Sequence, residues 1–119
     1  MIVRPGSAMA TAAQARMPLR YQAAECLLIG SETEGSPTVV KQALSVGIPV
    51  VGVDVADVWE WISDVAWSRL VARDVEAIAH GLVAVANAPR PASPPPCVAE
   101  FDVGAIARRL FAVYEDVLA

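Results

Sequence analysis

The sequence predicts an α/β domain with a parallel, Rossmann-like sheet flanked by helices. Two short runs, CLLIGS at 26–31 and IPVVGVD at 48–54, are continuously apolar, as expected of strands that are buried on both faces. The segment between them, PTVVKQALSV at 37–46, repeats its apolar residues at helical spacing. A strand, a helix and a strand in such close succession form a βαβ unit, and these units build parallel sheets.

The first elements have clear boundaries. The segment MPLRYQAAE at 17–25 is typical of a short helix opened by Pro18. For the helix at 37–46, Ser36 is the predicted N-cap and Pro37 the first helical residue. Gly47 follows its last turn, where a left-handed residue often ends a helix.

The later elements repeat the pattern more weakly. A short helix with Asp57 as its cap is predicted to come next, followed by an edge strand at 68–72 and a longer helix at 74–88. PRPASPPPC at 89–97 contains five prolines in nine residues and predicts an extended connector. The segment 102–118 is predicted to be an amphipathic helix. Its wide apolar face indicates that it packs against another protein surface.

Composition limits the function classes. The 119 residues suffice for one domain, and 55% are hydrophobic. The net charge of -4 and the absence of a basic cluster argue against nucleic acid as the main partner. No apolar run reaches the roughly 20 residues of a transmembrane segment. Cys26 and Cys97 have no metal or redox spacing, which favours reduced thiols in the cytoplasm. Residues 1–16 are predicted to be a tail of unknown role.

The loop SETEGSP at 31–37 follows the first predicted strand, at the edge of a parallel sheet where ligands bind. The next helix directs its free N–H groups and its positive dipole end toward this loop, which suits a phosphate. Gly35 would let the backbone approach a ligand, and Glu34 could accept hydrogen bonds from neutral hydroxyls. A sugar phosphate fits both features. In an equally weighted alternative, Glu34 only complements the helix dipole and Ser36 only caps the helix.

Other residue types point to function less strongly. Glu32 and Glu34 could form the carboxylate pair of a glycoside hydrolase, although two acids on one loop rarely lie on both sides of a substrate. His80, the only histidine, has no spacing typical of a catalytic partner and is expected to be structural. Trp59 and Trp61 are two residues apart and cannot share a helix face, so packing in a core is favoured for at least one of the tryptophans.

The segment from Met17 to Ile62 resembles the donor-binding half of family-four glycosyltransferases, which have the GT-B fold. The features that match are Glu34, Gly35, the following helix, the Gly-x-Pro-Val-Val strand that begins at Gly47, and the Asp-Val pair at 54–55. Later segments resemble the family's last helices, so the similarity covers about 17–119. The resemblance implies a partial nucleotide-sugar-binding domain, and retention of anomeric configuration.

The resemblance also implies residue roles. Glu34 would hold the hydroxyls of the donor hexose, and the backbone of Gly35 and Ser36 would line the sugar. The backbone of Thr38 and Val39 would contact the pyrophosphate. Gln42 stands where the family has a second glutamate that binds the ribose diol, and an amide binds a diol more weakly than a carboxylate does. A further departure from the family pattern is Ala56, which stands where glycine is usual.

The resemblance leaves two hypotheses. In the first, the chain is the donor-binding portion of a retaining glycosyltransferase that transfers a hexose from a nucleotide-sugar, without a metal or other cofactor, to an unidentified acceptor. In the second, it is a truncated, non-catalytic half-domain that acts as an assembly element. The family's acceptor domain would precede this chain, so the chain alone is expected to be inactive. The predicted partners are a nucleotide-sugar and either further copies of the chain or the missing N-terminal domain. The predicted location is cytoplasmic, with a peripheral membrane position left open.

Overall fold

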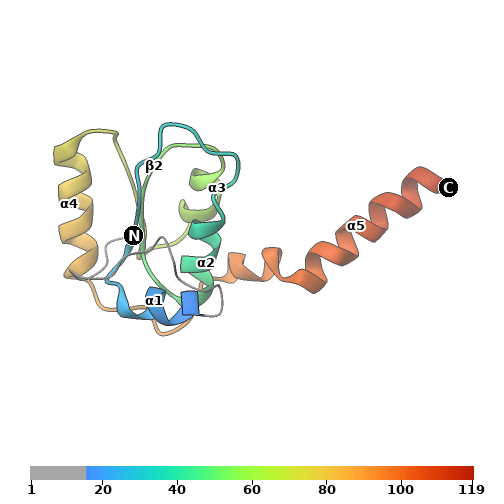
Figure 1. Ribbon diagram of the computed structural model, residues 1–119, viewed down its shortest axis with the longest axis horizontal. Coiled ribbons are helices and arrows are strands. Elements are labelled where there is room, and N and C mark those ends of the chain that lie inside the picture. Colours follow the sequence, from blue (N-terminus) through green and yellow to red (C-terminus); the bar gives the residue numbers. More distant parts are fainter. Residues whose placement is uncertain (1–15) are drawn as a thin grey trace.

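The structure is a computed structural model that describes residues 16–119, so the predicted tail at 1–16 lies almost wholly outside the described residues. Helices and strands alternate through the first part of the chain, and two further helical elements follow (Figure 1). In chain order the elements are α1 (Met17–Ala23), β1 (Leu27–Ile29), α2 (Thr38–Val46), β2 (Val50–Val53), α3 (Val58–Ile62), β3 (Arg69–Val71), α4 (Val75–Ala86), the 3-10 helix η2 (Pro96–Phe101) and α5 (Val103–Leu118).

The three described strands form one parallel sheet in the order β1-β2-β3. Leu27 of β1 lies opposite Val50 of β2, and Val51 of β2 lies opposite Arg69 of β3. All four residues of the central strand β2 are buried, which explains its continuously apolar sequence. The predicted α/β class, the parallel sheet and the edge position of the third strand are therefore confirmed.

Helices cover both faces of this sheet. Figure 1 shows α4 on one side of β2 and α2 and α3 on the other. Two glycines allow the close contact. A Cβ on Gly81 of α4 would lie 2.9 Å from a methyl carbon of Val71, and one on Gly52 of β2 would lie 2.9 Å from a methyl carbon of Val58 in α3. The arrangement is Rossmann-like because a parallel sheet lies between two layers of helices.

The helix α2 begins one residue later than the sequence predicts. Pro37 has a helical φ of -68° but an extended ψ of 106°, so it is the cap residue and Thr38 is the first helical residue. Ser36 is not the N-cap, and its hydroxyl instead contacts a carboxylate across the loop. At the other end, Gly47 adopts the predicted left-handed conformation, with φ 76°.

The proline-rich segment is only partly an extended connector. Its last residues, Pro96 and Cys97, belong to η2, which packs its Phe101 side chain against the core. The helix α5 then begins after Asp102, whose carboxylate accepts a hydrogen bond from the backbone N–H of Ala105 at 3.1 Å. The prediction that 89–97 contains no folded element is wrong for these final residues, because the aromatic contacts that hold η2 come from distant parts of the chain.

The helix α5 projects away from the rest of the domain (Figure 1). Its sixteen residues include no buried side chain, and the chain measures 53 Å along its longest axis against 31 and 29 Å along the others. The expected amphipathic helix is therefore present, but its apolar face does not dock on the described body. None of the helices in the described part of the chain is long and apolar enough to cross a membrane.

Candidate functional site

The predicted site loop leaves β1 at the edge of the sheet where the parallel strands end. Glu34 and Gly35 are exposed in this loop, and a Cβ placed on Gly35 would have no atom within 4 Å. The loop's first residues are held by Arg73, which follows β3. Its guanidinium donates hydrogen bonds to the carbonyl oxygens of Gly30 at 2.8 Å and Ser31 at 2.6 Å. Arg73 therefore ties the exit of the first strand to the exit of the third.

A polar cluster joins the same loop to α2 and α3. The Ser36 hydroxyl donates to Oδ2 of Asp57 at 2.6 Å, and the indole N–H of Trp61 donates to the same oxygen at 2.8 Å. Nζ of Lys41 donates to the Ser36 hydroxyl and lies 3.6 Å from Oδ2 of Asp57. Lys41 also lies over the Trp61 ring, 5.0 Å from its centroid. The cluster fixes Ser36 and explains why this side chain does not cap α2.

Asp57 is the centre of this cluster and is held in its ionised form. Partial burial by itself raises the pKa of Asp57. The hydrogen bonds from Ser36 and Trp61 and the positive charge of Lys41 outweigh burial, so the pKa lies below its ordinary value. Its second oxygen, Oδ1, is buried and has no hydrogen-bond partner among the described residues.

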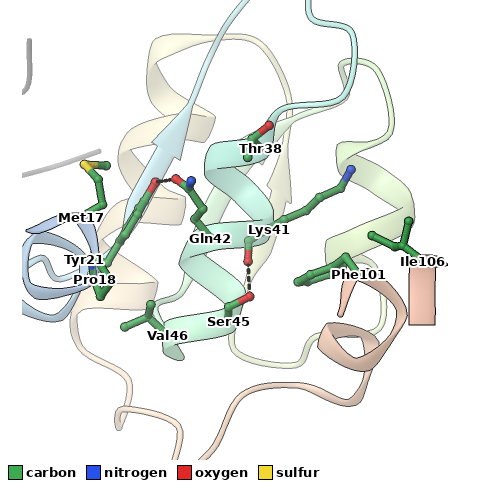
Figure 2. A pocket seen from close by; sticks show the side chains of 10 residues that line it. All are labelled: Met17, Pro18, Tyr21, Thr38, Lys41, Gln42, Ser45, Val46, Phe101 and Ile106. Carbon is green, nitrogen blue, oxygen red and sulfur yellow. Dashed lines mark hydrogen bonds between the residues drawn. The ribbon is translucent and has the colours of Figure 1, made fainter. Parts of the chain in front are cut away.

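A largely apolar cavity of about 480 Å³ runs along the other side of α2 (Figure 2). Its walls come from α1, α2, η2 and the first turn of α5, and include Phe101 and Ile106. The Gln42 side chain points across it, where its Oε1 accepts a hydrogen bond from the Tyr21 hydroxyl at 2.9 Å. Thr38 lies at the end of the cavity nearest the site loop. The cavity could hold a flat or apolar group next to an amide and two hydroxyl side chains, Thr38 and Ser45.

The structure brings only some of the six predicted site residues together. Thr38 and Gln42 line the cavity, whereas Ser36 faces the Asp57 cluster. Val39 is half-buried and packs against the core, so only its backbone is available to a ligand. The remaining two, Glu34 and Gly35, are exposed on the loop. The N–H groups of Thr38 and Val39 are in the first turn of α2, where a helix has no internal acceptors for them.

Sequence reasoning missed three side chains that shape this edge. They are Lys41, Asp57 and Arg73. Asp57 accepts a hydrogen bond from Ser36, which lies 21 residues earlier in the chain, and Lys41 lies beside both. One sequence feature could have indicated Lys41, because it is the only lysine in the chain and lies on the helix that follows the site loop. Asp57 is the N-cap residue of α3, as predicted, but its side chain makes no capping hydrogen bond.

The turn after β2 is tight although it lacks glycine. Ala56 has a φ of 49°, in the left-handed region that glycine adopts most easily. An alanine at this position therefore does not prevent a close turn. The turn places Asp57 at the start of α3, facing Ser36.

The remaining candidates have structural roles or are exposed. Trp61 packs edge-on against Phe101, with ring centroids 5.1 Å apart, and Trp67 packs against the core, as predicted for at least one tryptophan. His80 is exposed on α4. Burial raises the pKa of both cysteine thiols, Cys26 and Cys97, so neither is activated as a thiolate at neutral pH. Among the described residues, no three side chains of the His, Cys, Asp and Glu types are grouped as a metal site would need.

No family model, curated protein or solved structure matches this chain. The candidate site is therefore defined by the geometry of the sheet edge and by the sequence resemblance alone.

Proposed function

We propose that this chain supplies the nucleotide-sugar-binding part of a retaining GT-B glycosyltransferase of family four. The observation that supports the proposal is the position of the Glu34–Gly35 loop. It follows the first strand of a parallel sheet and leads directly into α2, whose first-turn N–H groups have no helical acceptors. An anion and neutral hydroxyls could be bound side by side at such an edge.

In this proposal each group binds the donor in a way that its chemistry allows. The exposed carboxylate of Glu34 accepts hydrogen bonds from hexose hydroxyls, and the backbone of Gly35 and Ser36 contacts the sugar. The N–H groups of Thr38 and Val39 and the positive end of the α2 dipole stabilise the pyrophosphate. The reaction chemistry then consists of positioning the donor and stabilising the diphosphate that leaves.

Gln42 would bind the ribose diol with the part of its amide that is still available. Its Oε1 already accepts a hydrogen bond from Tyr21, so its NH₂ group would donate to a ribose hydroxyl. The adjacent cavity, lined by Tyr21 and Phe101, offers apolar surface to the nucleoside. A glutamate at position 42 could accept from both Tyr21 and the diol.

Calorimetric titration tests the proposal with a panel of common nucleotide-sugars and the matching nucleoside diphosphates. Glu34→Gln should weaken binding of the nucleotide-sugar several-fold, because a hydrogen bond to a carboxylate is worth about 1 kcal/mol more than a neutral one. It should leave binding of the nucleoside diphosphate unchanged. Gln42→Glu should strengthen binding of both ligands by a similar factor. Glu32→Gln is the matched control, because Glu32 is also exposed on this loop.

Gly35→Ala tests whether a ligand approaches the backbone at this position, without a change in the stability of the domain. The added methyl group meets no atom within 4 Å, and the φ of Gly35 is not in the left-handed region, so the stability of the domain should not change. Donor binding should fall if the ligand contacts this backbone. The proposal is contradicted if no ligand of the panel binds, or if Glu34→Gln and Glu32→Gln have equal effects.

A second candidate function, that of an assembly element, is favoured by a separate observation. The large apolar residues of α5 are exposed, and none of them belongs to a hydrophobic core cluster of the described body. A chain that ends at Asp102 tests this role, because it lacks only α5. It should unfold at the same temperature as the dilute full-length chain and should lose any self-association. A clearly lower unfolding temperature would show instead that α5 stabilises its own domain.

A further inference from the structure

Side chains of the described chain hold the site loop at two points. At its start, Arg73 donates hydrogen bonds to the carbonyl oxygens of Gly30 and Ser31. The next five residues, 32–36, are all exposed, and within the described chain Ser36 alone among them makes a side-chain hydrogen bond. The segment with Glu34 and Gly35 therefore lies between two anchors, and the second anchor is the side chain of Ser36.

The second anchor depends on Asp57. Its Oδ2 accepts hydrogen bonds from the Ser36 hydroxyl at 2.6 Å and from the indole N–H of Trp61 at 2.8 Å, and Nζ of Lys41 lies 3.6 Å away. Its Oδ1 is buried. Trp61 is fixed in turn by its edge-on contact with Phe101. The carboxylate is thus committed to groups of the chain itself, and its contact with the site loop is the hydrogen bond from Ser36.

Backbone strain accompanies this contact. Ala56 has a φ of 49° and is the only non-glycine residue of the described chain with a positive φ. Strain of this kind persists where the surrounding structure imposes it, and it is concentrated at functional sites. In this chain the strained turn places Asp57 so that its carboxylate meets Ser36.

The anchor acts on the orientation of the loop relative to α2. Burial raises the pKa of Asp57, but the hydrogen bonds to its carboxylate and the charge of Lys41 lower it further, so Asp57 is ionised at neutral pH. A hydrogen bond to an ionised acceptor is stronger than one to a neutral acceptor. Ser36 is followed directly by Pro37, whose ring fixes φ, and then by the first turn of α2. Holding Ser36 therefore sets where Gly35 lies relative to the N–H groups of that turn.

We infer that Asp57 is a positioning residue, which acts through the Ser36 hydroxyl to hold the segment with Glu34 and Gly35 in the orientation that binds the donor. The inference rests on the proposed function, because it concerns the same site. It adds a residue that does not touch the donor. When the anchor is released, only a fraction of the chains have the competent loop conformation, and the apparent affinity falls by that fraction.

A double-variant cycle tests whether Asp57 acts through Ser36. The probes are UDP-glucose and GDP-mannose, titrated by calorimetry into the full chain. Ser36→Ala, which changes no charge, should weaken binding about fivefold, as expected for the loss of one hydrogen bond. In an Asp57→Ala background the same substitution should have almost no further effect. The charge lost with Asp57 is absent from both chains of this second comparison and cancels. Equal losses in the two backgrounds would overturn the inference.

Two controls separate positioning from a general loss of stability. Thr33→Ala removes another exposed hydroxyl from the same loop, one that makes no hydrogen bond in the described chain, and it should bind like the wild type. Gly81→Ala destabilises the packing of α4, because the added Cβ would lie 2.9 Å from a methyl carbon of Val71. It should leave donor affinity unchanged well below the unfolding temperature. A loss as large as that of Ser36→Ala would show that stability, and not positioning, controls binding.

Motion of the loop without a ligand separates failure of this inference from failure of the proposed function. Nuclear magnetic relaxation of the Gly35 amide measures its motion on the ps–ns timescale. Ser36→Ala and Asp57→Ala should each increase this motion, the double variant should increase it no further, and Thr33→Ala should leave it unchanged. If the wild type binds no nucleotide-sugar, the donor function is wrong, and increased motion still shows that Asp57 holds the loop. Unchanged motion in Asp57→Ala overturns the inference whether or not a donor binds.

Discussion

At the scale of single residues, Asp57 links the site loop to α3. This role predicts that the stability of the domain depends on pH. Its pKa is lowered in the folded chain, so its ionised form stabilises the fold above the ordinary pKa of about 4. This contribution is lost as the pH falls through the lower, folded pKa. Asp57→Asn should therefore reduce the free energy of unfolding by about 1–2 kcal/mol at neutral pH.

The difference between Asp57→Asn and the wild type should begin to shrink below about pH 4, where the unfolded chain binds the proton first, and should be smallest below the lowered pKa of the folded carboxyl group. Urea unfolding at a series of pH values measures this difference. Asp64→Asn serves as control, since Asp64 is exposed and lies outside the cluster. A difference that stays constant down to strongly acidic pH would show that the charge of Asp57 contributes no stability.

Ala56 gives a second prediction at this scale. Its φ of 49° costs an L-residue about 1–2 kcal/mol, and glycine adopts this conformation without strain. Ala56→Gly should therefore raise the free energy of unfolding by about 0.5–1 kcal/mol, after the greater flexibility of glycine in the unfolded chain is subtracted. Thermal unfolding checks this result. The control Ala66→Gly, in a turn with ordinary φ, should be slightly destabilising, and an equal loss at position 56 would contradict the prediction.

At the scale of elements, the packing of α3 on the sheet depends on Gly52. A Cβ at this position would lie 2.9 Å from Val58 and 3.1 Å from Ile29, which is closer than packed carbon atoms tolerate. Gly52→Ala should cost about 1–3 kcal/mol through displacement of α3. Chemical unfolding of Gly52→Ala, Val58→Ala and the double variant measures this. The double variant should be more stable than the sum of the single losses implies, because the smaller side chain makes room.

Gly30→Ala is the matched control for this experiment. A Cβ at Gly30 would have no atom within 4 Å, so the substitution should have little effect. If Gly52→Ala were as mild as Gly30→Ala, the contact between α3 and the strand β2 would be looser than the described distances imply.

The elements that could be predicted from the sequence are those fixed by local patterns. The continuous apolar run in β2 indicates burial, and the glycine after α2 indicates the end of that helix. Both features were predicted. The start of α2 was displaced by one residue because Ser36 binds Asp57, which is 21 residues away. The position of η2 also depends on a distant contact, because its Phe101 ring packs against Trp61. Contacts between distant segments leave no spacing pattern in a single sequence.

The candidate site was predictable in its location but not in its detail. The loop with Glu34 and Gly35 could be placed at the sheet edge, because it joins a buried strand to a helix. Two contacts depend instead on the packing of separate elements. One is the hydrogen bond between Tyr21 and Gln42, and the other is the pair of hydrogen bonds by which Arg73, after β3, holds the end of β1. Side chains that converge from three parts of the chain become visible only in the folded structure.

At the scale of the whole molecule, the domain consists of a packed body and a projecting helix. The core is built from the three strands and the helices that cover them, and no side chain of α5 belongs to it. The amphipathic pattern of 102–118 identified the helix but not its partner, because the pattern is the same whether the apolar face docks within the chain or between chains.

Hydrogen exchange should separate these two parts of the molecule. The amides of β2, at the centre of the sheet, should exchange only on global unfolding and independently of protein concentration. The amides of α5 should exchange quickly in dilute protein, because a single helix of this length is marginally stable, and more slowly as concentration rises and copies pair. If α5 is as strongly protected as β2 at every concentration, the helix is held within its own chain, and its apolar face is covered by residues of that chain.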